Sequence, residues 1–135
     1  LSFQLLFKEW PLQGTGTYAQ RTVQSIPALH DPHASPTSIK ISSQSHSLVF
    51  SGDTGWNEKL VELSADTDAL IIECSFQDHI FDGHISLAEI EKYRSTLTSK
   101  RLILTHFGER SRAAAVEKQA LLKLEVADDG VVWNI

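Results

Sequence analysis

The stretch Leu48-Val-Phe-Ser-Gly-Asp-Thr-Gly55 is a short apolar run that ends on an aspartate inside a glycine-containing turn. In layered α/β folds, ligands are held at the carboxyl ends of strands, where the chain leaves the sheet and side chains converge. The pattern therefore predicts one site that contains His30, Asp53, Glu73 and His106. Three further apolar runs end on a residue that can bind a metal or move a proton: Val23 to Leu29 before His30, Ala69 to Ile72 before Glu73, and Arg101 to Thr105 before His106.

The part of the chain before Gly55 reads as strands joined by turns. Pro11 and the Gly14-Thr15-Gly16 stretch indicate a turn, and Gln44 to His46 suit a hairpin turn. These strands resemble an antiparallel meander. Their expected ranges are Ser2 to Phe7, Tyr18 to Leu29, Ser38 to Ser42 and Ser47 to Ser51.

After Gly55 the apolar residues recur with a helical period, and strands alternate with helices, which indicates an α/β fold. Ser86 stands three residues before Glu89, the spacing of a capping box at a helix start. Strands are expected at Asp68 to Glu73, Arg101 to Thr105 and Val131 to Trp133. The expected apolar stripes of the helices are Trp56, Leu60 and Leu63; Leu87, Ile90 and Leu97; and Ala113, Val116, Ala120, Leu121 and Leu124.

Length and composition predict one domain with one core. The chain has 135 residues, of which 41% are hydrophobic, and a formal net charge of -5, so charge gives no support for a nucleic-acid partner. The single Cys74 favours a small buried residue and a reducing, cytoplasmic setting. No apolar stretch approaches the roughly 18 residues of a membrane span, so no membrane partner is expected. Because the sequence starts at Leu1 and lacks methionine, we expect a fragment of a longer protein.

The residue types at the strand ends favour a hydrolytic metal site. Imidazole and carboxylate ligands without a set of thiolates suit zinc, manganese or iron better than a closed structural zinc site. The small neighbours of Asp53 would let a metal approach, and an aspartate can bridge two metals. Each residue also has a plainer interpretation. His30, His84 and His106 could be solvated turn residues, Asp53 could cap the next helix, and Glu73 could support a ligand rather than bind metal.

Four motifs together resemble the C-terminal half of a metallo-β-lactamase-fold hydrolase, of the branch that includes ribonuclease Z and related phosphodiesterases. The resemblance covers Ser2 to Gly108 and implies an αββα sandwich with two divalent metal ions, zinc first. The motifs are Leu48-Val-Phe-Ser-Gly-Asp-Thr-Gly55, Ala69-Leu-Ile-Ile-Glu-Cys-Ser-Phe76, Gly83-His-Ile-Ser86 and Arg101-Leu-Ile-Leu-Thr-His-Phe-Gly108.

Carried over residue by residue, the resemblance implies a role for each candidate. His30 would complete the histidine set of the first metal, with His33 as an alternative ligand. Asp53 would bridge the two metals and act in catalysis, and His106 would bind the second metal. His84 would contact the scissile phosphate and protonate the leaving group, although Ile85 departs from the usual serine or threonine. Glu73 would support the site.

The family's central motif, His-x-His-x-Asp-His, does not occur in the sequence. Residues 1–135 are therefore expected to be the C-terminal portion of one domain. The missing N-terminal half would be their partner, with a homodimer as another expected association, and the isolated chain would be inactive. Only 22 residues separate His30 from Asp53, which leaves no room for the tRNA-gripping arm of many ribonuclease Z enzymes. We expect a small phosphodiester or ester substrate. A tRNA 3′-end endonuclease and a non-catalytic half-domain are the alternatives.

Overall fold

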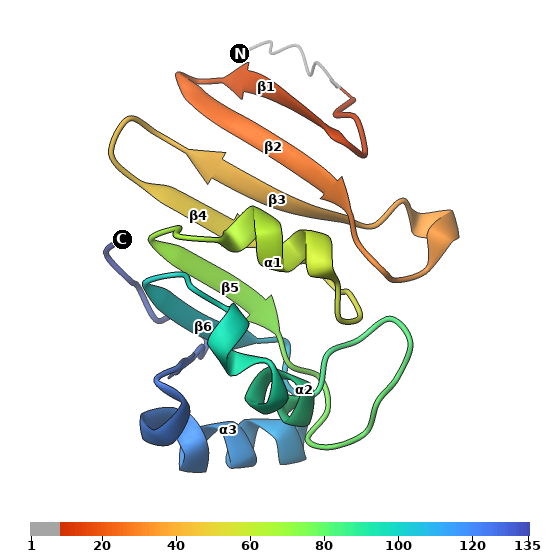
Figure 1. Cartoon of the computed structure of the whole chain (residues 1–135), viewed down its shortest axis with the longest axis vertical. Helices are drawn as coiled ribbons and strands as arrows, with labels where there is room; N and C mark the ends of the chain where they lie inside the picture. The colour runs from red at the N-terminus through yellow and green to blue at the C-terminus, as the bar shows by residue number, and fades with distance from the viewer. Residues whose placement is uncertain (1–8) are drawn as a thin grey trace, which may run out of the picture.

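The strands of residues 9–135, the part of the chain that the computed structural model describes, form one sheet in the order of the chain (Figure 1). The seven strands lie side by side in chain order, from β1 to β7. The strand expected at Ser2 to Phe7 lies outside the described residues. The bounds are β1 Gly14–Tyr18, β2 Arg21–Pro27, β3 Thr37–Ser42, β4 Ser47–Phe50, β5 Ala69–Glu73, β6 Arg101–Thr105 and β7 Glu125–Val126.

The first four strands form the antiparallel meander that the sequence predicts, but its first turn is elsewhere. Ala19 and Gln20 both have left-handed backbone conformations, with φ of 47° and 62°, and they connect β1 to β2. Tyr18 to Leu29 was therefore wrong as a single strand. Two consecutive left-handed residues match the twist of a tight hairpin, although neither residue type usually marks such a turn.

Gly14 to Gly16 lie in β1 rather than in a turn. Their glycines serve close packing, because a Cβ atom on Gly16 would lie 2.7 Å from the Trp10 ring and one on Gly14 would lie 2.8 Å from Pro11. Side-chain packing, rather than turn chemistry, thus explains Gly14 and Gly16.

The expected hairpin near Gln44 to His46 is confirmed, since the Ser43 amide donates to the His46 carbonyl oxygen over 2.8 Å between β3 and β4.

From β4 onward the strands are parallel, and a helix connects each strand to the next (Figure 1). The helices are α1 Glu58–Ser64, α2 Leu87–Lys92 and α3 Glu109–Leu122, with short 3-10 turns η1 Pro32–Ala34 and η2 Arg94–Thr96. The core lies where the helices pack against one face of the sheet. It includes Leu60, Leu63, Leu70, Ile72, Leu87, Ile90, Leu102, Leu104, Ala115 and Leu122. The α/β class is confirmed.

The helix starts follow the sequence more closely than the helix ends. The capping box of Ser86 and Glu89 is present, and each side chain accepts from the other residue's amide. Helix α2 nevertheless ends at Lys92, so Leu97 reaches the core from beyond η2. The phase expected for α3 was wrong: Val116 and Leu121 are 40% and 75% exposed.

The polar Ser111 is buried on the inner face of α3, because its hydroxyl donates to the Ser75 carbonyl oxygen over 3.1 Å. This long-range contact fixes how α3 is rotated and leaves no sign in the hydrophobic pattern. The strand expected at Val131 to Trp133 was also wrong, since the last strand is β7, which pairs with β6.

The face of the sheet opposite the helices carries a second set of apolar side chains. Phe50 pairs with Ile39 on one side and Ile71 on the other, and Ile41 pairs with Leu48. Phe50 is 44% exposed and Ile41 is 37% exposed. In the described part of the chain, no helix is long and apolar enough to cross a membrane.

Candidate metal centre

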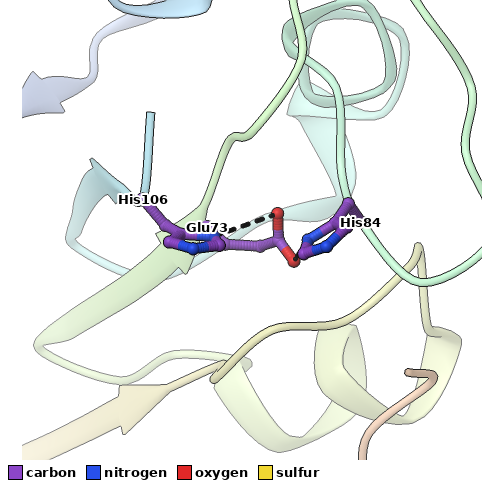
Figure 2. Close-up of side chains that lie close together, drawn as sticks. All are labelled: Glu73, His84 and His106. Carbon is purple, nitrogen blue, oxygen red and sulfur yellow. Dashed lines mark hydrogen bonds and ion pairs between the residues drawn. The ribbon is translucent and has the colours of Figure 1, made fainter. Parts of the chain in front are cut away.

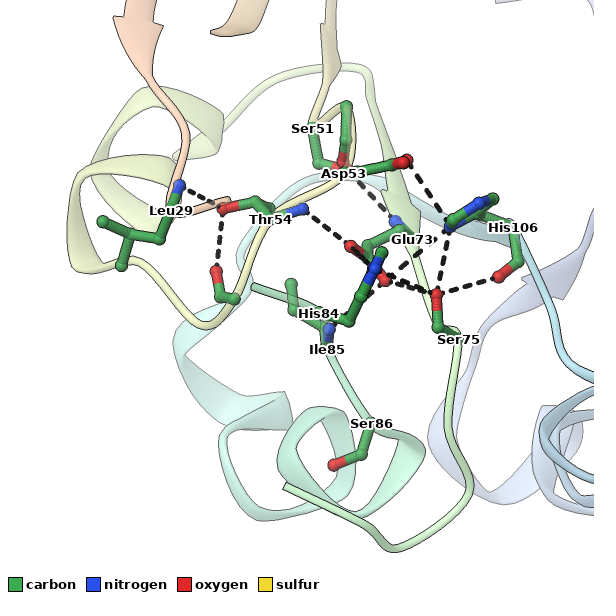
Figure 3. Close-up of polar contacts among 12 residues, drawn as sticks. Leu29, Ser51, Asp53, Thr54, Glu73, Ser75, His84, Ile85, Ser86 and His106 are labelled. Carbon is green, nitrogen blue, oxygen red and sulfur yellow. Dashed lines mark hydrogen bonds and ion pairs between the residues drawn. The ribbon is translucent and has the colours of Figure 1, made fainter. Parts of the chain in front are cut away.

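The carboxyl ends of β4, β5 and β6 meet at one edge of the sheet, because these strands are parallel neighbours. Asp53 lies in the turn that follows β4, Glu73 is the last residue of β5, and His106 directly follows β6. Figure 3 shows their side chains together with His84, which comes from the loop before α2. The structure thus gathers three of the four expected strand ends around one point.

Glu73 lies at the centre of this cluster, and its side chain is only 1% exposed. Oxygen Oε1 accepts from the Thr54 amide over 2.6 Å and from His84 Nδ1 over 2.9 Å. Oxygen Oε2 accepts from the Ser75 hydroxyl over 2.8 Å and from the Ile85 amide over 3.2 Å. With two donors on each oxygen, the carboxylate is suited to hold its neighbours in place, as the supporting interpretation expects.

His106 and Asp53 form the exposed side of the cluster. His106 Nδ1 lies 3.4 Å from Asp53 Oδ1, and the two side chains are 50% and 48% exposed. His106 also has a left-handed backbone, with φ of 57°, which few residues other than glycine adopt readily. A strained backbone at a polar, accessible position is typical of functional sites.

Ser75 contacts both Glu73 and the imidazole of His106. With its one proton given to Glu73 over 2.8 Å, its hydroxyl can accept from His106 Nδ1 over 3.0 Å. Nε2 then carries the lone pair that a metal ligand needs. Sequence reasoning did not assign Ser75 a role. Its place two residues after Glu73, in the same motif, was the available signal.

His84 and His30 lie next to each other. Their ring centroids are 4.9 Å apart in an edge-on arrangement, and His84 lies 5.6 Å from His106. Gly83 makes this approach possible, because its φ of 110° favours glycine and its backbone packs against His30. His33, the alternative ligand, is exposed in η1, and its amide donates to Asp31. No contact among the described residues links it to the centre.

The donor atoms of Glu73, His84 and His106 all lie within 4.8 Å of one another (Figure 2). Imidazole nitrogens and carboxylate oxygens in this arrangement fit a divalent ion such as zinc. No lysine or arginine among residues 9–135 pairs with these side chains. Because Glu73 already accepts four hydrogen bonds, His84, His106, Asp53 and His30 offer the more available ligand atoms.

Two further residues that the sequence did not single out hold the turn of Asp53. The Ser51 hydroxyl accepts from the Glu73 amide over 3.0 Å, and the Thr54 hydroxyl accepts from the Leu29 amide over 2.9 Å. Both side chains are buried. Together they tie the loop after β2 and the turn after β4 to the end of β5.

Cys74 follows Glu73 but points into the core. Burial raises the pKa of its thiol to about 12, and the neighbouring Glu73 carboxylate adds to this effect. A thiol of this kind stays protonated and does not act as a nucleophile near neutral pH. The interpretation of Cys74 as a small buried residue is confirmed.

Comparison with known proteins identifies the class to which this fold and site belong. The Beta-lactamase superfamily domain matches residues 7–107, and the chain therefore belongs to this family. The crystal structure of the metallo-beta-lactamase fold protein YhfI from Bacillus subtilis is similar, with a TM-score of 0.78 and 22% identity, over 92% of this chain and 54% of that chain. Human tRNase Z, short form, gives a TM-score of 0.64 at 20% identity, over 89% and 44% of the two chains. The expected metallo-β-lactamase fold is confirmed.

Two curated relatives connect the chain to named hydrolases. It is 27% identical over 103 residues to the probable metallo-hydrolase YhfI of Bacillus subtilis, which covers 71% of this chain and 42% of the relative. It is 34% identical over 106 residues to the mitochondrial Ribonuclease Z 2 of Schizosaccharomyces pombe, which covers 75% of this chain and 15% of the relative. The chain thus spans less than half the length of either relative.

Proposed function

We propose that this chain forms part of a metal-dependent hydrolase that cleaves a phosphodiester or a related ester. The observation that carries this proposal is the meeting of Asp53, Glu73, His84 and His106 at one sheet edge, with no pairing lysine or arginine among the described residues. When bound, two divalent ions would supply a hydroxide of lowered pKa for attack on the ester. Membership of the β-lactamase superfamily supports this reaction class.

The proposed ligands are His30 for the first ion, Asp53 for both ions and His106 for the second. Glu73 would orient the site through its hydrogen bonds. His84 would act on the leaving group. Its Nδ1 donates to Glu73 over 2.9 Å, so the proton for the departing oxygen would come from Nε2 of the imidazolium form, which leaves a neutral imidazole protonated on Nδ1. The buried carboxylate of Glu73 fixes the orientation of this ring.

Three ligands cannot complete two metal sites, so we propose that the others come from a complementary part of the domain outside these 135 residues. The apolar sheet face with Phe50 and Ile41 supports this proposal, because contiguous exposed apolar area normally marks an interface. We expect the isolated chain to be inactive, and to self-associate unless that part covers the face. A monomer in sedimentation experiments that unfolds cooperatively would contradict this expectation.

The substrate is proposed to be small. Between His30 and Asp53 the chain is used by η1, β3 and β4, which leaves no long arm to hold a tRNA. The similarity to Ribonuclease Z 2 favours tRNA 3′-end cleavage as the second candidate. Assays with a precursor tRNA and bis(4-nitrophenyl) phosphate separate the two, since cleavage of the small ester alone supports the first proposal.

Asp53→Ala tests the metal-dependent reaction in the hydrolase assembled with its complementary part. We expect hydrolysis to be abolished and bound zinc, measured by elemental analysis, to fall, because the bridging carboxylate is lost. Glu117→Ala on the exposed side of α3 is the control and should retain both hydrolysis and bound zinc. Unchanged metal content in the Asp53 variant would refute the assignment, and absence of zinc from the unaltered protein would favour a non-catalytic module.

His84→Ala tests the proposed proton transfer. We expect turnover to fall by about 10²–10⁴-fold, the range for loss of a general acid, while bound zinc is retained. Elemental analysis and a steady-state assay measure the two quantities on the same preparation. Loss of zinc would instead make His84 a ligand, a role that the 4.8 Å limit on the distances among the donor atoms of Glu73, His84 and His106 permits.

A further inference from the structure

A cavity of about 400 Å³ lies beside the candidate metal centre. Three segments surround it: Leu29 and His30 after β2, Trp56 before α1, and the loop with Ile80 and Phe81 before α2. Its volume is in the range of cavities that hold small organic ligands. The cavity and the centre share one residue, His30, so an occupant of the cavity would lie next to the reacting group.

The wall of the cavity also contacts His84. The Phe81 ring lies roughly parallel to the His84 ring, with centroids 6.2 Å apart and an angle of 29° between the planes. Ile80 and Phe81 are 71% and 52% exposed, so their apolar surfaces face open space rather than the core. A flat apolar group in the cavity would therefore lie within reach of the imidazole that we propose as proton donor.

The charge of the lining excludes one class of ligand. Asp82 and Glu89 are its charged side chains, and none of the described residues that line it is a lysine or an arginine. Glu89 Oε2 accepts from the Ser86 amide and hydroxyl, which fixes this carboxylate at the start of α2. A negatively charged group would be repelled by these two carboxylates, whereas an uncharged apolar group would not.

Close backbone contacts fix the position of the cavity relative to the centre. The Gly55 amide donates to the Leu29 carbonyl oxygen over 2.7 Å, and a Cβ atom on Gly55 would lie 3.1 Å from the Gly83 amide nitrogen. The Thr54 amide in turn donates to Glu73. Hydrogen bonds therefore connect the backbone that lines the cavity at Leu29 and Gly55 to the buried carboxylate of Glu73.

From these contacts we propose that this cavity binds the uncharged aromatic or apolar leaving group of the ester. This assignment rests on the proposed hydrolysis and narrows its substrate class. The oxygen of the breaking ester bond lies at His84 and takes its proton there, while the apolar body of the leaving group packs between Phe81 and Trp56. A polynucleotide, whose leaving group carries further phosphates, does not fit this lining.

Binding of 2-naphthol to the metal-free hydrolase, assembled with its complementary part, tests the cavity without turnover. In ¹H–¹⁵N spectra we expect the indole Nε1–H signal of Trp56 and the amide signals of Leu29 and Gly83 to shift, while the indole signal of Trp10 does not. Phe81→Ala and Ile80→Ala should each weaken binding about two- to tenfold, as expected for loss of an aromatic or apolar contact. Leu121→Ala, at a 75% exposed position on α3, is the matched control and should bind normally.

A probe with the same rings and a negative charge, 2-naphthalenesulfonate, should bind more weakly than 2-naphthol, and Asp82→Asn should narrow that difference. The proposal is overturned if the two probes bind equally well. It is also overturned if the Leu121 variant loses as much affinity for 2-naphthol as the Phe81 and Ile80 variants. The probe needs no metal. If 2-naphthol does not bind while the unaltered protein binds zinc, the cavity assignment alone is refuted. If 2-naphthol binds while the unaltered protein does not bind zinc, the proposed hydrolase is refuted instead.

Discussion

Charged side chains gather at both ends of the parallel strands, but among residues 9–135 they form ion pairs with lysine or arginine at one end only. At the amino ends, Asp68 contacts Lys100 over 2.7 Å and Arg101 contacts Glu125 over 2.8 and 2.7 Å. At the carboxyl ends, Asp53, Glu73, His84 and His106 face one another, and no lysine or arginine of the described part of the chain pairs with them.

The charged side chains at the amino ends stabilise the fold by pairing with one another, whereas those at the carboxyl ends are arranged to bind a ligand. Acids and bases at the amino ends neutralise each other and join β4, β5 and β6, since Asp68 Oδ2 also accepts from the Ser47 amide over 2.8 Å. At the carboxyl ends the acceptors exceed the cations supplied by the described chain. Such an excess of acceptors is favourable where a metal ion supplies the opposite charge.

The largest expected effect comes from Glu73→Gln at the carboxyl ends. The amide that replaces one oxygen is a donor and cannot accept from the buried groups that face it, so we expect a loss of about 2–4 kcal/mol in the free energy of unfolding. Urea denaturation measures this loss, with Glu117→Gln on the exposed side of α3 as the control. Equal stability of the two variants would mean that Glu73 does not organise the site.

His106→Gly and His106→Ala form a pair that separates backbone strain from ligand chemistry. Both remove the imidazole, so zinc affinity measured by calorimetry should fall equally, by tenfold or more. Because the backbone at this position is left-handed, the glycine variant should be more stable than the alanine variant by about 1 kcal/mol. If the alanine variant is as stable, the strain at this strand end is not real.

Asp68→Asn gives the smallest effect and concerns the amino ends. The hydrogen bond from Lys100 lowers the pKa of Asp68 to about 2, followed by that from the Ser47 amide. The ionised carboxylate therefore stabilises the folded state fully above its ordinary pKa near 4, and this contribution is lost as the pH falls from about 4 to 2.

Thermal unfolding over that pH range tests the prediction. The stability difference between the original protein and the Asp68 variant should shrink as the pH falls, and added salt should reduce it because the pair is exposed. Zinc affinity should not change. A stability difference that grows on acidification would contradict the assignment of the ion pair.

The strands that carry the site could be predicted from the sequence because each is an apolar run followed directly by a polar residue. The ends of β5 and β6 fall at the expected Glu73 and Thr105, and Asp53 follows β4 closely. The Ala19-Gln20 turn escaped prediction because neither residue is typical of left-handed positions. The packing of Trp10 against Gly16 depends on side-chain shape, and the hydrogen bond from Ser111 to the Ser75 carbonyl oxygen joins residues 36 positions apart. Local sequence patterns reveal neither contact.

The same distinction applies to the site. The chemistry of single residues at strand ends indicated His30, Asp53 and His106, whereas His84 was indicated by the family resemblance. Their roles as metal ligands and proton donor stay predictions. The four hydrogen bonds of Glu73 could not be foreseen, since the Thr54 and Ile85 amides come from different loops. Ser75 was missed because it acts through its contacts with Glu73 and His106.

The strand order of the sheet also affects how the chain folds. Because every strand pairs with its neighbours in sequence, each can add to a growing edge as soon as it leaves the ribosome, without separating strands already paired. The antiparallel pairs of the meander join residues close in sequence, such as Tyr18 and Arg21, and are expected to form quickly. Parallel partners such as Ala69 and Arg101 lie far apart in sequence, so closing the chain between them costs more entropy and is slower. The strand ends that carry Glu73 and His106 are therefore paired after the meander on which they are built.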